Sequence, residues 1–329
     1  MLISKRTAMK KILIVTNMFP SNSNPSSGIF VKEQIEELTK YTDFDYRVFL
    51  IDGKAKGKLE YLKSIFRVPK LIKKYKPDII HVHYGISGLF LLFHKSRNSK
   101  VIVTLHGGDI QEKGSTPLQI FLTKKVVRYA DQVFVQNTEM KKIIEKINPK
   151  VEIMTCGIDP DFFRTESINI IENNSTTILF PSSPGRWDKN YPLFEEVIGI
   201  LKKKGYKNIR IATLENLSRE EVRDVMNQSD VLLMTSVSEG SPQAIKEALL
   251  CNLPIVSTPV GDVIDIVENI PNCFVSNSHE AIELAELTEK ALIGGKKGIR
   301  EAFLKKDNYF NKNLAERLAI HYGLTFLEK

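Results

Sequence analysis

The sequence has no apolar run long enough to cross a membrane as a helix. Its apolar stretches, such as residues 12–15 and 231–234, have the length of strands, whereas a membrane-spanning helix needs about 20 consecutive apolar residues. Only the first of these stretches follows the basic N-terminal segment, and a secretory signal needs an apolar segment of about 7–15 residues. We therefore expect no signal peptide and a cytoplasmic location.

Cysteine is also scarce. The three cysteines, Cys156, Cys251 and Cys273, are an odd number without paired spacing. This pattern is typical of small buried side chains in a reducing compartment, and it argues against a disulfide framework.

Acidic residues are nearly absent between Lys54 and Lys76, where nine lysines and arginines accompany the single acid Glu60. Apolar residues such as Leu62 and Phe66 lie between the charges. The mixture fits a helix packed on a sheet, and it fits equally well an amphipathic helix on an anionic surface, which is either lipid or a phosphate-bearing acceptor. Peripheral contact with the inner face of a membrane is therefore one expectation for this stretch.

The rest of the composition describes a globular protein of two domains. The chain has 329 residues, of which 42% are apolar and 26% charged, with a net charge of +8, and its length fits two domains of average size. Short apolar runs alternate with segments of helical spacing up to about residue 154, and the same rhythm restarts at residue 177 after a polar loop over 159–175. Such alternation predicts mostly parallel sheets between helices.

We therefore expect an α/β protein with two doubly wound, Rossmann-like domains. The predicted domains are residues 9–160 and 161–309, and a C-terminal helix over about 310–329 is expected to pack back on the first of them. Ligands in such folds bind beyond the carboxyl ends of the strands, so a cleft between the two domains is the expected site.

The sharpest local pattern follows the buried strand that ends near residue 234. A short loop places Glu239, and Gly240 permits a tight turn or a close backbone approach. Ser241 is a good N-cap, and Pro242 suits the first position of a helix, where no N–H is needed. The pattern predicts a helix that begins at Pro242.

The start of this helix is the expected anion site. The amides of Gln243 and Ala244 lie in the first turn, where amides have no intrahelical acceptor and the helix dipole is positive, and this suits a diphosphate. Glu247 lies about a turn further on, and a carboxylate can accept two hydrogen bonds from the paired hydroxyls of a ribose.

The segment from Ser238 to Glu247 resembles the E-x7-E signature of glycosyltransferase family 4. Weaker similarities follow in chain order over nearly the whole sequence, and they include Asn17-Met-Phe-Pro with Gly28, His81-Val-His83, Thr104-Leu-His106-Gly-Gly-Asp109 and Thr155-Cys-Gly157-Ile-Asp159. The resemblance implies the GT-B fold. It also implies a retaining enzyme that moves a sugar from a nucleotide-sugar donor to a saccharide or lipid-linked acceptor, in the synthesis of cell-envelope polysaccharide or glycolipid.

The resemblance also implies roles on the donor side. Glu247 would hold the ribose, Glu239 would act as a catalytic residue beside the transferred sugar, and the amides around Gln243 and Ala244 would hold the diphosphate. The basic pair that stabilises charge on the leaving diphosphate in this family would be Arg186 and Lys189, although here the two lie closer in sequence than is usual. The donor-binding set is completed by Gly28, Gly240 and Ser241.

On the acceptor side, the resemblance places the catalytic His106 beside the donor sugar and the acceptor hydroxyl, where an imidazole suits hydrogen bonding or proton handling. Asp109 competes with it for the acceptor role, and His83 is a further acceptor-side residue. His81 and His83 point the same way along a strand, but no third metal ligand is suggested nearby. We expect no metal, no cofactor and no nucleic acid partner, and a mechanism in which an oxygen of the departing diphosphate helps to take the proton of the acceptor.

Three alternatives stay open. A sugar-nucleotide 2-epimerase has the same architecture and would turn over its nucleotide sugar without an acceptor. A nicotinamide-dependent oxidoreductase is compatible with parallel sheets, but no G-x-G-x-x-G follows the first strand. A non-catalytic sugar- or nucleotide-binding subunit is the third alternative. The donor base, the sugar and the acceptor are not specified by the sequence.

Overall fold

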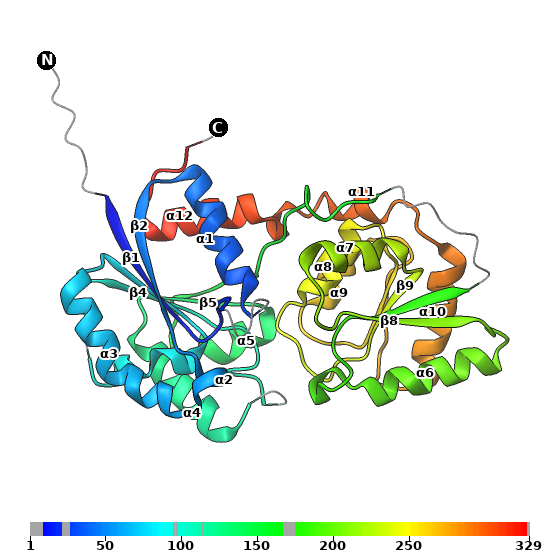
Figure 1. Cartoon of the computed structure of the whole chain (residues 1–329), viewed down its shortest axis with the longest axis horizontal. Helices are drawn as coiled ribbons and strands as arrows, with labels where there is room; N and C mark the ends of the chain where they lie inside the picture. The colour runs from blue at the N-terminus through cyan, green and yellow to red at the C-terminus, as the bar shows by residue number, and fades with distance from the viewer. Residues whose placement is uncertain are drawn as a thin grey trace, which may run out of the picture. The chain divides into compact units, whose positions relative to one another are not determined.

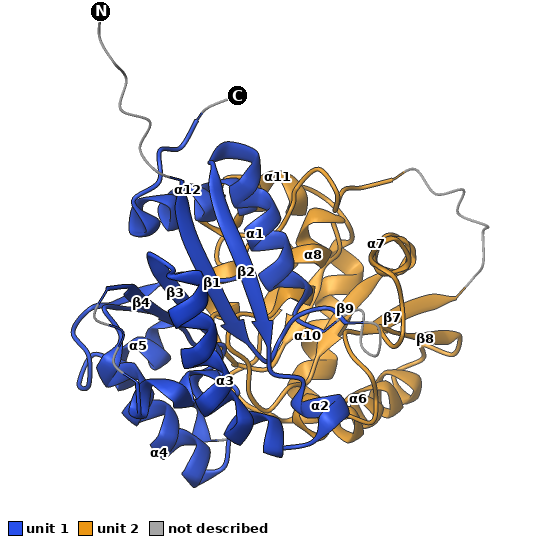
Figure 2. Ribbon diagram, turned by 60° about the vertical axis from the view of Figure 1, so that its left-hand side comes forward, with its two compact units in different colours: residues 1–156, 311–329 blue, residues 157–310 orange. Residues whose placement is uncertain are grey.

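The computed structural model describes residues 9–21, 27–94, 96, 98–112, 115–166 and 175–327. The chain divides into two compact units, coloured separately in Figure 2. Unit 1 is Met1–Cys156 with Asn311–Lys329, and unit 2 is Gly157–Phe310. The N-terminal eight residues, which bear on the signal-peptide prediction, lie outside the described residues, as do parts of the loops predicted over residues 17–28 and 159–175.

Unit 1 is built on a parallel sheet whose described strands follow the order β2-β1-β3-β4-β5-β6. Most of these strands are short apolar runs buried on both faces, as expected for parallel strands covered by helices. Their carboxyl ends bring His83 opposite Thr16 on one side and Thr104 on the other. The strands are β1 (Lys10–Thr16), β2 (Phe44–Leu50), β3 (Ile79–His83), β4 (Lys100–Thr104), β5 (Gln132–Val135) and β6 (Val151–Ile153).

Helices cover both faces of this sheet (Figure 1). One apolar layer lies under α1 (Ile29–Tyr41) and α12 (Asn311–Tyr322). The layer on the other face involves α3 (Leu59–Tyr75), η1 (Gly85–Leu92), α4 (Pro117–Val126), η3 (Val127–Tyr129) and α5 (Thr138–Ile144). The short helix α2 (Gly53–Lys56) has no buried residue.

The last helix, α12, belongs to unit 1 although it lies at the far end of the sequence. Its apolar residues, at spacings of three and four, pack on the layer under α1. The hydroxyl of Tyr322 contacts Nδ1 of His81 at 2.5 Å, and Lys10 Nζ donates to the Tyr322 carbonyl at 2.9 Å. The helix ends at Tyr322 and is followed by Gly323 with φ +60°, so it is shorter than the predicted helix over 310–329.

Unit 2 repeats the architecture with a parallel sheet of strand order β11-β10-β9-β7-β8 in its described part. The strands are β7 (Thr176–Phe180), β8 (Ile209–Thr213), β9 (Val231–Met234), β10 (Ile255–Ser257) and β11 (Phe274–Val275). Apolar clusters again lie on both faces. The prediction of two doubly wound α/β sheets is therefore confirmed.

The helices of unit 2 are η4 (Trp187–Lys189), α6 (Tyr191–Lys203), α7 (Arg219–Gln228), α8 (Gln243–Leu250), α9 (Val263–Val267), α10 (Ala281–Gly294), α11 (Ile299–Phe303) and η5 (Asp307–Tyr309). A capping box formed by Ser218 and Glu221 is present at the start of α7. The sequence analysis did not predict α9, β11 or α10. No helix in the described part of the chain is long and apolar enough to cross a membrane.

The two units meet along the chain after Cys156, slightly earlier than the expected boundary after residue 160. The reason is a long-range contact. Ile158 pairs with Phe310, and its N–H donates to the carbonyl of Tyr309 at 3.0 Å. Phe163 is fully buried in the core of unit 2. Residues 157–163 are therefore tied to unit 2.

Candidate functional site

In unit 2, the loop after β9 brings Glu239 against Lys189 of η4. The Glu239 carboxylate and the Lys189 ammonium form an ion pair, and each side chain is only 12% exposed. The hydroxyl of Ser236 donates to the same carboxylate at 2.7 Å. The Thr235 hydroxyl lies 3.0 Å from the carbonyls of Lys189 and Asn190. The loop that carries the acid and the turn that carries the base are thus held together.

The helix α8 begins at Gln243, with Pro242 as its N-cap. The prediction that Ser241 is the N-cap and Pro242 the first helical residue is therefore wrong by one position. The Ser241 hydroxyl accepts a hydrogen bond from Lys246 Nζ at 3.2 Å instead. Within the described residues no acceptor is found for the amides of Gln243 and Ala244, so the start of α8 has free donors at the positive end of its dipole.

Glu247 is almost completely buried, at 4% exposure. Its Oε1 accepts from Arg219 Nη1 at 2.5 Å, and the guanidinium of Arg219 lies 4.7 Å from the centre of the Phe163 ring. Because a carboxylate accepts hydrogen bonds at both oxygens, this contact is compatible with a diol at the second oxygen. The sequence analysis did not identify Arg219.

Two buried charged residues lie behind the loop that carries Glu239. Lys246 is fully buried, and Asp262 at the start of α9 is nearly so. Burial raises the pKa of Asp262 to about 6, and the positive charge of Lys246 acts in the opposite direction. Gly261 has φ +58°, and a Cβ there would lie 2.7 Å from the Gly240 carbonyl oxygen. The loop after β10 therefore packs directly on the backbone at Gly240, and only glycine fits that approach.

The two predicted phosphate-binding cations differ in their surroundings. Arg186 is largely exposed, and its guanidinium pairs with the neighbouring Asp188 at 2.5 Å. Lys189 is enclosed and reaches Glu239. The structure thus brings together Lys189 and Glu239, but it leaves Arg186 on the surface beside its own acidic neighbour.

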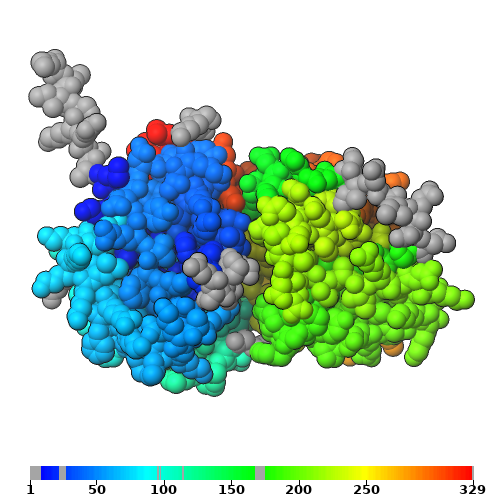
Figure 3. Space-filling model, in the orientation of Figure 1, coloured from blue at the N-terminus to red at the C-terminus, as the bar shows by residue number. Residues whose placement is uncertain are grey.

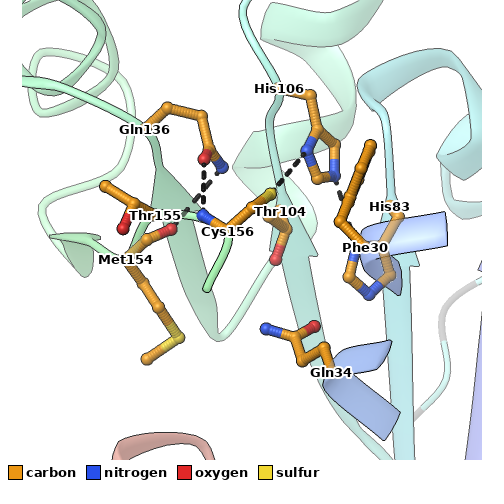
Figure 4. A pocket seen from close by; sticks show the side chains of 9 residues that line it. All are labelled: Phe30, Gln34, His83, Thr104, His106, Gln136, Met154, Thr155 and Cys156. Carbon is orange, nitrogen blue, oxygen red and sulfur yellow. Dashed lines mark hydrogen bonds between the residues drawn. The ribbon is translucent and has the colours of Figure 1, made fainter. Parts of the chain in front are cut away.

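In unit 1, His83 at the end of β3 and His106 after β4 lie edge to edge. His83 Nδ1 is 3.3 Å from His106 Nε2, and the ring centres are 5.5 Å apart with planes inclined by 23°. On its other side, His106 Nδ1 lies 3.8 Å from the Sγ of Cys156. Figure 4 shows the three side chains around a small pocket, whose lining is completed by Phe30, Gln34, Thr104, Gln136, Met154 and Thr155.

These imidazoles are neutral at ordinary pH. Burial lowers the pKa of His81 and of His106 to about 3, and it lowers the pKa of His83 well below its usual value. A neutral imidazole has one donor and one acceptor nitrogen. Both nitrogens of His106, which the family resemblance implies to be catalytic, already face protein partners. The geometry therefore favours a hydrogen-bonding role for this side chain over the uptake of a proton.

Asp109 is fully buried and acts on the backbone of this loop. Its carboxylate accepts from the N–H groups of Gly85, His106 and Gly107 at 3.0–3.1 Å. Burial raises its pKa to about 6, and these hydrogen bonds oppose that rise. The arrangement fixes the His106 backbone. It does not present the Asp109 carboxylate to a ligand, although the sequence analysis placed this residue on the acceptor side.

Gly28 is the N-cap of α1, with φ +64°, and a Cβ there would lie 2.2 Å from the Met18 carbonyl carbon. The backbone at the start of α1 therefore requires a glycine at this position. Residues 22–26 of the loop before Gly28 lie outside the described residues. In the described part of the chain, no group of three or more His, Cys, Asp or Glu side chains is arranged to hold a metal ion.

Comparison with known families identifies the chain. The family of glycosyl transferases group 1 matches residues 120–313, which is more than half of the sequence, and glycosyltransferase family 4 matches residues 33–162. The chain belongs to the group 1 glycosyltransferases. It is therefore a transferase, as the resemblance of the segment from Ser238 to Glu247 to family 4 implied.

Three relatives that this glycosyltransferase resembles in sequence are also named as glycosyltransferases. An uncharacterized glycosyltransferase of Methanocaldococcus jannaschii is 25% identical over 64% of this chain and 64% of its own length. A putative teichuronic acid biosynthesis glycosyltransferase of Bacillus subtilis is 21% identical over 77% of this chain and 82% of its own. The UDP-Gal:alpha-D-GlcNAc-diphosphoundecaprenol alpha-1,3-galactosyltransferase of Escherichia coli is 23% identical over 77% and 74%.

The fold of this glycosyltransferase matches solved structures as well. The sucrose-phosphate synthase of Thermosynechococcus elongatus superposes with a TM-score of 0.76 over 96% of this chain and 98% of that one, at 14% identity. At that identity the likeness shows the GT-B fold alone.

Proposed function

We propose that this enzyme is a retaining glycosyltransferase that uses a nucleoside diphosphate sugar and needs no metal. Unit 2 binds the donor, and unit 1 receives a saccharide or lipid-linked acceptor. The observation that carries the proposal is the start of α8. The amides of Gln243 and Ala244 have no acceptor among the described residues, and the helix begins four residues after Glu239, the acid of the enclosed pair with Lys189.

The donor is recognised by charge at one end and by hydroxyl groups at the other. The amides and dipole at the start of α8 attract the diphosphate, and Lys189 stabilises the charge that develops as the glycosidic bond to phosphate breaks. Glu247 accepts from the ribose diol, while Arg219 holds its Oε1 in place. Glu239 faces the transferred sugar. Arg186 joins the phosphate site only if it leaves Asp188.

The proposed chemistry retains the anomeric configuration. The acceptor hydroxyl attacks from the face that the diphosphate leaves, and a diphosphate oxygen takes the proton. The state of the unit 1 histidines supports this choice of base. Burial holds the pKa of His81, His83 and His106 far below neutrality. His106 also has both nitrogens engaged, so these three imidazoles are poor proton acceptors near pH 7.

The acceptor class follows from the relatives. The E. coli relative is named for a GlcNAc-diphosphoundecaprenol acceptor, and the B. subtilis relative for teichuronic acid biosynthesis. We propose that the present enzyme likewise extends a cell-envelope polysaccharide or glycolipid precursor, in the cytoplasm and at the inner face of the membrane.

The surface of α3 supports contact with such a membrane. Its Val68, Ile72 and Tyr75 pack on the core, while Leu59, Leu62 and Phe66 are 64%, 55% and 71% exposed on the outer side. All nine cations from Lys54 to Lys76 are exposed as well, on a surface of unit 1 that the space-filling view shows in lighter blue (Figure 3). Exposed apolar side chains among basic ones suit insertion at an anionic bilayer surface.

The test is a transfer assay with the full chain. UDP-galactose, UDP-glucose, GDP-mannose and ADP-glucose are each incubated with a GlcNAc-diphosphate lipid, with and without EDTA. We expect one donor to give an acceptor-dependent product with the donor's anomeric configuration, and EDTA to leave the rate unchanged. Loss of turnover in EDTA would overturn the metal-free mechanism, and an inverted product would overturn retention.

A further inference from the structure

The pocket of unit 1 contains buried polar atoms that the protein does not satisfy. Nε2 of His83 and Oγ1 of Thr155 have no hydrogen-bond partner among the described residues, and both residues are more than nine-tenths buried. Both residues line the pocket in Figure 4. An orphaned buried donor or acceptor destabilises the fold unless a water or ligand satisfies it.

The size of the pocket limits what can occupy it. Its volume is about 10 Å³, close to the smallest space that holds one water molecule. A hydroxyl oxygen has the same size and the same hydrogen-bonding capacity as water. A carboxylate or phosphate would be too large, and the three neutral imidazoles of this region would not balance its charge.

The direction of the hydrogen bonds follows from the chain of partners. A neutral imidazole prefers its proton on Nε2 in the absence of other influences. With that tautomer on both rings, the Cys156 thiol donates to His106 Nδ1, and His106 Nε2–H donates to His83 Nδ1. Each contact then has one donor and one acceptor. The Nε2–H of His83 is left over as a donor for a group in the pocket.

We propose that this pocket binds one hydroxyl group of a sugar substrate, and that His83 is its hydrogen-bond donor, aligned by His106 and Cys156. Thr155 supplies the second polar contact. His83 is a substrate-binding residue in this arrangement, whereas His106 and Cys156 are positioning residues. The identity of the hydroxyl rests on the proposed function; the hydrogen-bond chain from Cys156 to His83 does not.

The tautomers can be measured without any activity. The chain has six histidines, and imidazole ¹⁵N chemical shifts of the full-length protein distinguish the Nε2–H from the Nδ1–H form. The variants His83→Gln and His106→Gln assign the two signals. We expect both rings in the Nε2–H form at neutral pH. An Nδ1–H form of either ring would overturn the proposed chain.

Cysteine variants test the alignment of His106. Cys156→Ser keeps an O–H donor at the position of the thiol, whereas Cys156→Val has none. We expect the serine variant to keep the Nε2–H signal of His106, and the valine variant to give an exchange-averaged signal. If the valine variant leaves the His106 signal unchanged, the thiol does not hold the ring.

Substrate binding is tested with Thr155→Val and His83→Phe, which keep approximate shape but remove the polar atom. With the nucleotide sugar that the wild type uses in the transfer assay as donor, each variant should lose roughly tenfold in kcat/KM, the loss expected for one hydrogen bond. The nucleoside diphosphate of that donor should still raise the melting temperature of each variant. Unchanged kcat/KM in both variants would overturn the binding role. If the wild type turns over no nucleotide sugar, the proposed function fails, and the tautomer measurement still decides the hydrogen-bond chain.

Discussion

The two units share one architecture but treat charge in opposite ways. In unit 2 the candidate residues are ionised and paired, as in Lys189–Glu239 and Arg219–Glu247. In unit 1 the ends of β3 and β4 carry neutral imidazoles. The carboxylate of the nearby Asp109 accepts hydrogen bonds from backbone N–H groups. The difference fits a division of work in which unit 2 stabilises an anionic leaving group and unit 1 binds neutral hydroxyls. The same fold thus supports two chemistries through its loops.

The largest expected effect comes from the enclosed cation of unit 2. Lys189→Met should lower kcat/KM about 10²–10³-fold, because a fixed charge at the leaving group acts mainly in the transition state. The exposed Arg186 is the matched cation, and Arg186→Met should cost less than about tenfold. Steady-state kinetics of the transfer reaction measure both. A larger loss at Arg186 than at Lys189 would show that Arg186, and not Lys189, stabilises the charge on the leaving group.

A smaller loss is expected at the ribose. Glu247→Gln should weaken UDP binding about tenfold, because a charge-assisted hydrogen bond becomes a neutral one. Titration calorimetry with UDP and with 2′-deoxy-UDP measures the effect and its cause. The wild type should prefer UDP, and the variant should lose most of that preference. A variant that discriminates as well as the wild type would remove Glu247 from the ribose site.

The proposed membrane contact is tested by comparing one exposed apolar residue on each unit. Phe66→Ser on α3 should reduce binding to phosphatidylglycerol vesicles about tenfold, since burial of an aromatic side chain is worth about 1.5–3 kcal/mol. Ile293, 79% exposed on α10 of unit 2, provides the control, and Ile293→Ser should have no effect. Vesicle co-sedimentation measures both. Equal losses in the two variants would show that α3 is not the docking face.

The smallest effect concerns stability in acid. The pKa of His81 and His106 is lowered from 6.5 to about 3, so between these values the unfolded chain binds protons that the folded one does not, and stability falls as the pH falls. The pKa of Asp262 is raised from 3.8 to about 6, so its folded state gains stability as the pH falls through that window. Asp109 of unit 1, whose pKa is also raised to about 6, acts in the same direction as Asp262. Both carboxyl groups therefore oppose the buried histidines.

Asp262→Asn isolates the two contributions. The melting temperature of the wild type should decline from pH 6.5 to pH 4.5, and that of the variant should decline more steeply, by a few degrees, because each group contributes up to about 1.4 kcal/mol per pH unit. Differential scanning calorimetry measures both slopes. Identical slopes would show that Asp262 is not protonated in the folded state over this range.

Much of the fold could be predicted because its signals are local. Buried parallel strands appear as short apolar runs, and the capping box of Ser218 and Glu221 lies within four residues. The weak regions lack such signals. The helix α9 has five residues and β11 has two, too few for a periodicity. The unit boundary depends on the pairing of Ile158 with Phe310. No local sequence pattern predicts this long-range contact.

The candidate site divides in the same way. Glu239, Gln243 and Glu247 stand out because strand, turn and helix start are contiguous. Their partners do not stand out, since Arg219 lies 28 residues from Glu247 and Cys156 lies 50 residues from His106. The burial of Lys246 is also hidden in the sequence, because a lysine in a helix usually faces solvent. Ser241 was misassigned because a good N-cap residue was preferred to the proline that follows it.

The most direct test of the central claim is the response of the Gln243 and Ala244 amides to UDP, followed by ¹H–¹⁵N spectra of the full-length protein. If the start of α8 in unit 2 holds the diphosphate, both amide signals should shift on titration with UDP and far less with uridine. Saturation with UDP that leaves both signals in place would show that the diphosphate binds elsewhere.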